Sequence, residues 1–226
     1  SPEASMIRHF ELPVMPKKDQ KNAVRFEAQK YIPIDIKDLY FDYESHGDSS
    51  RKKMDIIFFA CKRQWVDRIA TLLVLLGMKI GRVELTSQSI ARAFRRNLPE
   101  NPGKAEALVL PSSESNAELV FFRDHSVLRT RHLPIAAAGN ADTAFLVSEL
   151  RLSLDNFSES FRGARVDKLY WVGTGGESVR ALGENLSKEL STKVEISDFL
   201  GALGNGQPGT VPISAAYGCA LASLQP

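Results

Sequence analysis

A glycine-rich turn between an apolar strand and a helix is the part of this sequence best suited to hold a small molecule. A strand is predicted over 169–172, followed by Gly173, Gly175 and Gly176 and by a helix that begins near Glu177. Backbone N–H groups at such a helix start can face an anion, and glycine lets the backbone approach a phosphate or an adenine closely. The spacing is not that of a dinucleotide-binding turn, and no Lys-Ser/Thr follows to complete a P-loop. The turn alone is therefore weak support for a nucleotide site, and a tight connection is the other interpretation.

The remaining reactive side chains form no recognisable catalytic or metal-binding pattern. Neither HExxH nor CxxC occurs, and no G-x-S-x-G motif supports a nucleophilic serine. The histidines lack metal-ligand spacing: His9, His46, His125 and His132. Three aspartates lie near ends of predicted elements with nothing to pair them as acid and base: Asp55, Asp67 and Asp124. We expect no catalytic residues, no metal site and no enzymatic activity of the chain by itself.

The overall charge gives no reason to expect a polyanionic partner. The 226 residues carry a formal net charge of +2, with 43% hydrophobic and 25% charged residues, which is ordinary for a globular protein. Neither nucleic-acid nor membrane binding is favoured by so small a net charge. Two basic clusters, Arg51–Lys53 and Arg95–Arg96, are interpreted as solvated faces.

The cysteines and the apolar segments suggest a reducing compartment and no membrane insertion. Cys61 and Cys219 both lie in apolar or small-residue segments and are predicted to be buried thiols rather than a disulfide. The longest apolar run, Ile69–Met78, is too short to span a bilayer.

The first 85 residues predict a small α/β unit. Strands are expected over 6–13, where apolar and polar residues alternate, and over 36–43, 54–61 and 79–85. A helix over 17–31 has Val24, Ala28 and Tyr31 on one face. A second helix places Trp65, Ile69, Leu72 and Leu76 on one face and ends at Gly77. The order strand-helix-strand, strand-helix-strand is that of a split β-α-β, ferredoxin-like arrangement.

Residues 86–226 predict a second unit of the actin-like type. A helix over 86–97 and a linker precede a three-strand meander over 105–110, 117–122 and 127–134. There follow a long helix with Val147, Leu150, Leu154 and Phe157 on its core face, the strand-glycine-helix unit, a strand over 193–197 and a closing helix over 213–224. In an actin-like half-domain the first hairpin carries an acidic residue and a glycine that grip phosphate and metal. Here Leu110-Pro111-Ser112-Ser113 stands in that place, so the main support for hydrolysis is lost.

The chain resembles the type IV pilus assembly protein PilM family, within the actin-like superfamily that includes FtsA and the GspL proteins of type II secretion. The segment Arg8–Tyr43 carries the most specific match, with Leu12-Pro13, Met15-Pro16 and Tyr31-Ile32-Pro33. Three further blocks are similar to the family: IIFFACKRQWVDRIATLLVLLGMKIGRVEL, the hairpin at 105–134, and GTGGESVRALGENLSKELSTKVEISDF with AAYGCALASL. The family has an additional N-terminal portion with a first phosphate hairpin, and we expect residues upstream of Ser1 in the native protein.

The resemblance implies a cytoplasmic scaffold, peripheral to the inner membrane, that grips the cytoplasmic tail of a PilN-like bitopic protein. It also makes pilus motor ATPases candidate partners. The family's peptide groove lies between the small α/β subdomain and the portion missing here, so exposed parts of residues 6–85 should form one wall. A scaffold needs exposed apolar surface, which we expect beside Trp65 or on the face of the helix over 17–31, although core packing explains both segments equally well. The degenerate hairpin favours a protein without ATP turnover and without a cofactor, with Gly173, Gly175, Gly176 and Glu177 as a vestigial nucleotide site. The alternatives are an ATP-dependent actin-like switch whose first phosphate loop lies upstream, and a kinase relative that has lost its motifs.

Overall fold

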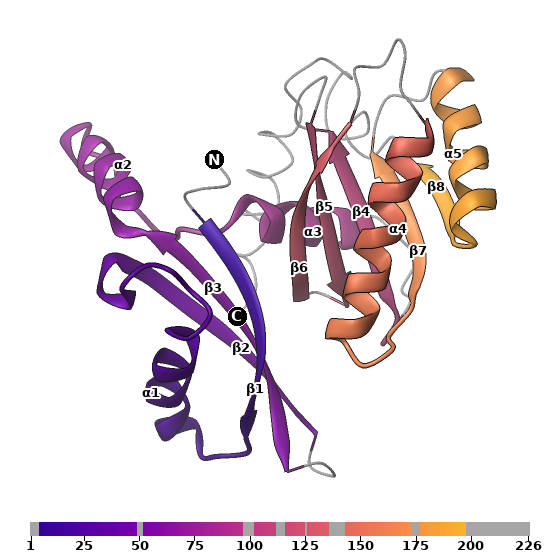
Figure 1. The fold of residues 1–226 in the computed structure, drawn as a ribbon. Coiled ribbons are helices and arrows are strands. Elements are labelled where there is room, and N and C mark those ends of the chain that lie inside the picture. The colour runs from indigo at the N-terminus through magenta and orange to yellow at the C-terminus, as the bar shows by residue number, and fades with distance from the viewer. Residues whose placement is uncertain are drawn as a thin grey trace. The chain divides into compact units, whose positions relative to one another are not determined.

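The computed structural model describes residues 5–48, 52–96, 102–111, 116–124, 126–135, 143–172 and 177–197. The chain divides into two compact units, residues 1–85 (the small unit) and residues 86–226 (the large unit). Each has its own sheet, of three and of five strands. The two units are coloured indigo to purple and magenta to orange in Figure 1.

The small unit is a three-stranded antiparallel sheet with one helix packed on it. Its elements are β1 (Ser5–Pro13), α1 (Lys17–Ala28), the 3-10 turn η1 (Ile36–Asp38), β2 (Leu39–Asp48), β3 (Lys53–Lys62) and α2 (Arg63–Leu75). The strand order is β1-β3-β2, so the last strand in sequence is central and pairs with both others. Three of the four strands predicted for this unit are present, although residues 36–38, predicted as the start of a strand, form η1 and the strand begins at Leu39.

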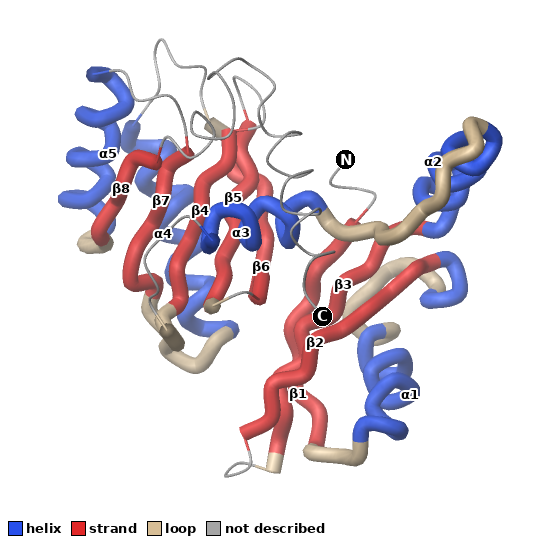
Figure 2. Tube along the Cα trace, turned by 180° about the vertical axis from the view of Figure 1, so that it is seen from behind, coloured by secondary structure: helices blue, strands red, loops and turns tan. Residues whose placement is uncertain are grey.

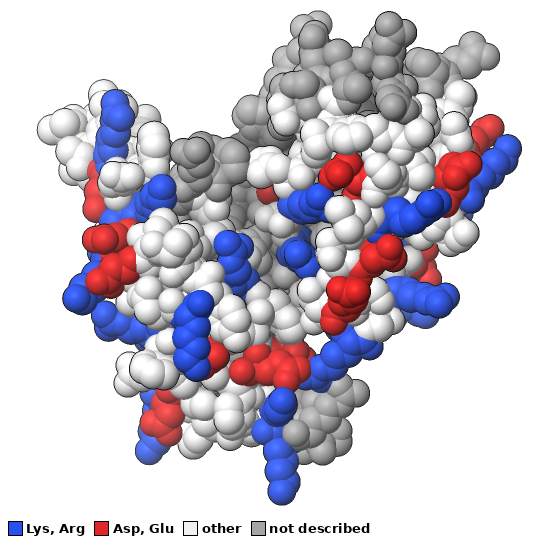
Figure 3. All heavy atoms as spheres, viewed as in Figure 1, with Lys and Arg blue, Asp and Glu red and all other residues white. Residues whose placement is uncertain are grey.

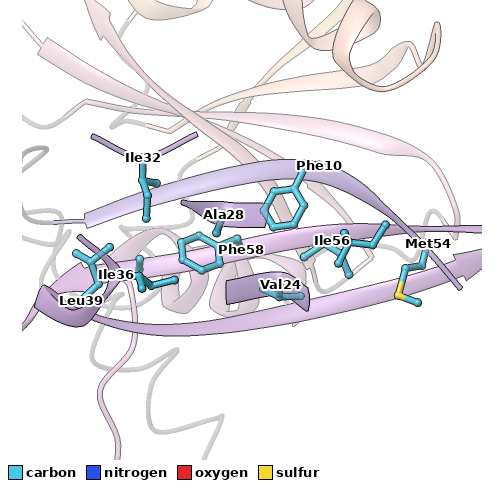
Figure 4. Packing of buried hydrophobic residues seen from close by; sticks show 11 residues of the cluster. Phe10, Val24, Ala28, Ile32, Ile36, Leu39, Met54, Ile56 and Phe58 are labelled. Atoms are coloured by element: carbon cyan, nitrogen blue, oxygen red, sulfur yellow. The ribbon is translucent and has the colours of Figure 1, made fainter. Parts of the chain in front are cut away.

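Helix α1 is held to the sheet by apolar side chains that lie one turn apart on the same face. Val24 and Ala28 are fully buried and pack against Phe10, Ile56 and Phe58 of the strands (Figure 4). The same spacing predicted a third core position at residue 31. Tyr31 instead lies beyond the end of the helix, 49% exposed, and its ring stacks on Phe10 at 5.5 Å between centroids.

The predicted strand over 79–85 is wrong. Residues 78–85 pair with no strand, and Ile80 and Val83 are 39% and 62% exposed. A strand is stable only when its backbone groups bond to a neighbour and one of its faces is covered. The described part of the small unit gives this segment neither. Of the split β-α-β arrangement, β1–α1–β2 and β3–α2 are present and the final strand is absent.

The large unit is a mixed sheet between helices. Its elements are α3 (Thr86–Arg96), β4 (Ala105–Pro111), β5 (Asn116–Arg123), β6 (Ser126–Pro134), α4 (Thr143–Ser160), β7 (Val166–Val172), α5 (Glu177–Leu190) and β8 (Lys193–Ser197). The strand order is β6-β5-β4-β7-β8, with an antiparallel meander from β4 to β6 and parallel pairing of β4, β7 and β8. Figures 1 and 2 show α4 and α5 on one face of the sheet and α3 on the other.

The core of the large unit follows the predicted helix face. Val147, Leu150 and Phe157 of α4 are buried, and Leu154 is half-buried. The ring of Phe157 stacks on Phe121 of β5 at 4.5 Å between centroids. The meander and β8 match their predicted positions to within two residues, while the predicted closing helix and Cys219 lie outside the described residues.

Two predictions about individual side chains are wrong. Arg95 is buried and paired with Glu106, because α3 presents it to the sheet rather than to solvent. Cys61 lies near the end of β3 and is only half-buried, although burial is still enough to raise the pKa of its thiol. Arg96 is exposed, as expected.

Candidate functional site

Helix α2 presents an apolar surface that nothing in the described chain covers. None of its residues is buried, although it is among the most hydrophobic stretches of the sequence. Leu75 is 79% exposed, Val74 63% and Leu72 58%. We define the α2 surface as the large apolar side chains of this helix and of the turn after it that are exposed: Trp65, Ile69, Leu72, Val74, Leu75, Leu76 and Met78.

The side-chain contacts that the described residues make between α2 and the sheet lie in the first two turns of the helix. The guanidinium of Arg63 lies 4.2 Å from the centre of the Tyr40 ring, and the Tyr40 hydroxyl donates a 2.9 Å hydrogen bond to Asp67 Oδ1. Beyond these contacts the helix projects past the end of the sheet, as Figure 1 shows. The helix is therefore attached at its start, and most of the large apolar side chains along the rest of it are exposed to solvent.

The C-terminal end of α2 is shaped by a glycine. Gly77 has φ of 76°, and its N–H donates to the Val74 carbonyl at 2.9 Å, while the N–H of Met78 donates to the Leu73 carbonyl at 2.9 Å. This is the Schellman pattern, in which a left-handed residue satisfies the last helix carbonyls. The predicted helix stop at Gly77 is therefore confirmed.

The side-chain composition of α2 suits a protein or peptide partner. Between Ile69 and Leu76 the only polar side chain is that of Thr71, and the last turn carries no basic residue. A helix that is apolar all round is normally buried, and contiguous exposed apolar patches mark interaction sites. Helical spacing predicted the face of this helix that carries Trp65, Ile69, Leu72 and Leu76. The exposure of Val74, Leu75 and Met78 was not predicted, because it follows from the lack of a covering element among the described residues.

A shallow cavity of about 340 Å³ lies at the attached end of α2. Its lining carries both signs of charge beside one apolar side chain: Ile34, Asp38, Lys62, Arg63 and Gln64. An apolar helix next to a polar, two-sign cavity is chemically suited to a short segment with apolar side chains and a polar or charged end.

The predicted nucleotide turn falls largely outside the described residues. Gly173, Gly175 and Gly176 lie there, and Glu177 is the first residue of α5. The flanking elements have the predicted strand and helix types, with β7 ending at Val172 and pairing in parallel with β8. The nucleotide-binding role of these four residues remains a prediction.

The hairpin between β4 and β5 carries a carboxylate, that of Glu118, which no motif in the sequence indicated. Leu110 is buried at the end of β4, and its cross-strand partner is Glu118 of β5, which in turn faces His132 of β6. Burial raises the pKa of Glu118. Ser112 and Ser113 lie outside the described residues. The place of Glu118 beside Leu110 and His132 follows from the pairing of the strands, which residue types alone do not give.

The described residues offer no other chemical centre. Among them there is no group of three or more His, Cys, Asp or Glu side chains that could hold a metal ion. His9 Nε2 lies 2.9 Å from Asp55 Oδ1 across neighbouring strands, a pairing of two residues that the sequence left unpaired. No helix within the described ranges has both the length and the apolar character needed to cross a bilayer.

Solved structures share this fold, whereas no protein-family model matches the sequence. A chain from a PilM–PilN type IV pilus biogenesis complex is similar with a TM-score of 0.73 and 21% identity, over all of this chain and 78% of that one. The cytoplasmic domain of EpsL, an inner-membrane component of the type II secretion system of Vibrio cholerae, is similar with a TM-score of 0.50 and 12% identity, over 95% of this chain and 70% of that one. The mixed α/β, actin-like fold that the sequence predicted is thus confirmed, and it is the fold of the PilM and EpsL chains.

Proposed function

We propose that this protein is an assembly component of a type IV pilus or type II secretion platform and binds the cytoplasmic tail of a PilN-like inner-membrane protein. The observation that carries the proposal is the exposed α2 surface within a fold shared with a chain from a PilM–PilN complex. A tail of this kind would hold the protein at the cytoplasmic side of the inner membrane. Pilus motor ATPases are further candidate partners.

The α2 surface is the part of the small unit best suited to contact such a tail. Burying an apolar side chain such as Leu72 or Leu75 against a partner contributes roughly 1.5–3 kcal/mol. Several such side chains lie within a few turns of each other, and hot spots of binding energy concentrate in clusters of this type. The mixed-charge cavity at the attached end of α2 offers Lys62 and Arg63 to a carboxylate and Asp38 to an amine.

We further propose that the protein acts without ATP turnover. At the hairpin where an actin-like domain places its phosphate-gripping acid, β4 ends in Leu110 and Pro111, and a proline provides no backbone donor. A scaffold needs no metal-holding cluster, and no group of three or more His, Cys, Asp or Glu side chains that could hold a metal ion occurs among the described residues.

The test is calorimetric titration of a synthetic peptide with the sequence of the PilN-like tail from the same genome. We expect binding to the wild-type chain and at least a tenfold loss for Leu72→Asp/Leu75→Asp, since two buried contacts are replaced by charges. Leu152→Asp is the matched control, because Leu152 is 49% exposed on α4 of the large unit. Equal binding by both variants, with both shown folded, would refute the role of the α2 surface.

The same calorimeter addresses the ATP-dependent alternative. Titration of Mg·ATP into the longest form of the protein that can be purified should give no heat. Micromolar binding that is lost in a folded Gly175→Asp variant would instead favour an actin-like switch and make the turn at 173–176 a working site.

A further inference from the structure

The exposed half of α1 is a basic surface with one aromatic side chain. On a helix, residues four apart form rows along its length, and four such rows encircle it. Gln20, Val24 and Ala28 form the row that faces the sheet, and all three are buried. Val24 and Ala28 point into the core in Figure 4. The next two rows are exposed at every position: Lys17, Lys21 and Arg25 in one, continued by Gln29 after the helix end, and Lys18, Asn22 and Phe26 in the other, continued by Lys30.

We call these two adjacent rows the α1 basic face. It holds five cationic side chains and no carboxylate, because the acidic residues of the helix, Asp19 and Glu27, belong to the fourth row. Of these five, Lys30 alone forms an ion pair with a described residue, 2.8 Å from Glu27. Lys17, Lys18 and Lys21 have no ion pair with any described residue. The net charge of +2 conceals this asymmetry, since acidic side chains elsewhere offset it. On the face of the molecule in Figure 3 both signs are interspersed.

Phe26 is the apolar element of this face. Its side chain is 74% exposed, and the Lys30 ammonium lies 5.6 Å from the centre of its ring. A large aromatic side chain so exposed gains nothing from the fold, and substitution by a polar residue would cost the core nothing. At an anionic membrane surface, lysines contact the headgroups and an aromatic side chain lies among them, so exposed basic residues beside an exposed aromatic ring suit such a surface.

We propose that the α1 basic face contacts the anionic lipid surface of the cytoplasmic leaflet, with its lysines over phospholipid headgroups and Phe26 in the headgroup region. The charge complementarity favours a bilayer because the cations are spread over three turns of one helix rather than focused on a point. The α2 surface is a poor alternative for this role, because from Ile69 to Leu76 it carries no basic side chain. This contact is separate from the proposed tail binding and would fix how the small unit is oriented at the membrane.

The expected affinity is modest and salt-dependent. Each lysine or arginine near an anionic bilayer strengthens binding by about fivefold, and the attraction falls off within a Debye length. Three unpaired lysines together therefore contribute about a hundredfold. Such a contact would be weak by itself and would act together with a membrane-anchored partner.

Co-sedimentation of the full chain with vesicles tests the proposal. We expect the chain to sediment with vesicles of equimolar phosphatidylcholine and phosphatidylglycerol at low ionic strength, and not with pure phosphatidylcholine. Lys17→Gln/Lys18→Gln/Lys21→Gln should abolish the sedimentation. The control Lys79→Gln/Lys104→Gln/Lys188→Gln removes the same charge from exposed positions elsewhere and should retain it. Circular dichroism and thermal unfolding establish that both variants are folded.

A tryptophan at position 26 reports on the aromatic contact. We expect the emission of Phe26→Trp, after subtraction of the wild-type emission from Trp65 and Trp171 under the same conditions, to shift to shorter wavelength with the anionic vesicles. The shift should be absent when the three lysines are also replaced. Phe26→Ser should weaken sedimentation several-fold without changing its salt dependence.

Four outcomes would overturn the proposal. The first is failure of the folded wild-type chain to bind anionic vesicles, and the second is equal binding by the α1 variant and its control. The third is binding of soluble polyglutamate with the same lysine dependence but no binding of vesicles, which would make the α1 basic face a site for an acidic protein. The fourth is vesicle binding that is indifferent to lipid charge and to the α1 lysines, which would place the lipid contact on the α2 surface.

Discussion

The guanidinium of Arg95, in the last turn of α3, lies 2.7 Å from the carboxylate of Glu106, near the start of β4, and both side chains are buried, at 5% and 1% exposure. The other carboxylate oxygen of Glu106 accepts a 3.1 Å hydrogen bond from the Tyr170 hydroxyl on β7. Burial, followed by the neighbouring Glu106, raises the pKa of Tyr170, so this phenol remains a donor at all ordinary pH values. The pair therefore ties α3 to two strands of the large sheet through a single carboxylate.

Removing one partner of this pair should be costly. In Arg95→Met, Glu106 would remain buried without its guanidinium, and we expect the free energy of unfolding to fall by about 3–5 kcal/mol in urea denaturation. Arg96→Met is the control, since its side chain is exposed at the neighbouring position and should change stability little. Arg95→Met/Glu106→Leu should recover a large part of the loss. A double variant no more stable than Arg95→Met would mean that packing, not charge, holds α3.

The buried Glu118 should favour folding of the large unit in mild acid, where its side chain is protonated, more than at neutral pH. Because burial raises its pKa in the folded chain, Glu118 binds its proton more tightly there than in the unfolded chain. Its contribution to stability is complete below the unfolded pKa and is lost as the pH rises through the folded pKa. Glu118→Gln should therefore raise the melting temperature at pH 7, with a smaller gain at pH 4. Glu159→Gln, at an exposed position, should give no such difference; a loss at pH 7 would indicate that charged Glu118 is stabilised by a partner.

The left-handed glycine after α2 should be intolerant of a side chain. Nothing lies within 4 Å of the place where a Cβ at Gly77 would sit, so the cost of Gly77→Ala is that of the backbone conformation alone, about 1–2 kcal/mol. We expect faster hydrogen exchange of the amides of residue 77 and Met78, which close the helix end. Gly81→Ala is the matched control, because its site is equally open and its φ is not in the left-handed region. Equal exchange in both variants would contradict the Schellman assignment.

The α2 surface should make the isolated chain prone to self-association. We expect Leu72→Lys/Leu75→Lys to lower the apparent particle size in dynamic light scattering at high protein concentration, with no loss of thermal stability, because neither side chain contributes to the core. The same double substitution should abolish binding of the PilN-like tail. A fall in melting temperature instead would show that the two leucines are buried in the folded protein in solution.

The features predictable from sequence are those decided by local pattern. Alternation over residues 6–13 placed β1, and a glycine marked the end of α2. The i, i+3, i+7 spacing of Val147, Leu150 and Leu154 placed the core face of α4. Each of these signals is local to one element. Their agreement with the structure reflects the fact that one buried face is enough to define a strand or a helix.

The features that escaped prediction depend on which elements meet. Residues 79–85 have the composition of a strand but no strand to pair with among the described residues, and α2 has the composition of a core helix but no described core over it. Arg95 belongs to a basic helix end, which is typical of a solvated surface, yet Glu106 lies opposite it in the core. The candidate site could be located beside Trp65 from sequence, while its extent over Leu75 and Met78 required the structure.

The strand order of the small unit also has a consequence for the way this chain acquires its structure. Since β3 lies between β1 and β2, the first two strands never touch, and neither has a sheet to join until residue 62 has been made. The β2–β3 hairpin closes a short loop, whereas β1 must find β3 across about forty intervening residues, from Pro13 to Lys53. We expect the hairpin to form first during synthesis and the strand that leaves the ribosome first to be the last one fixed in place.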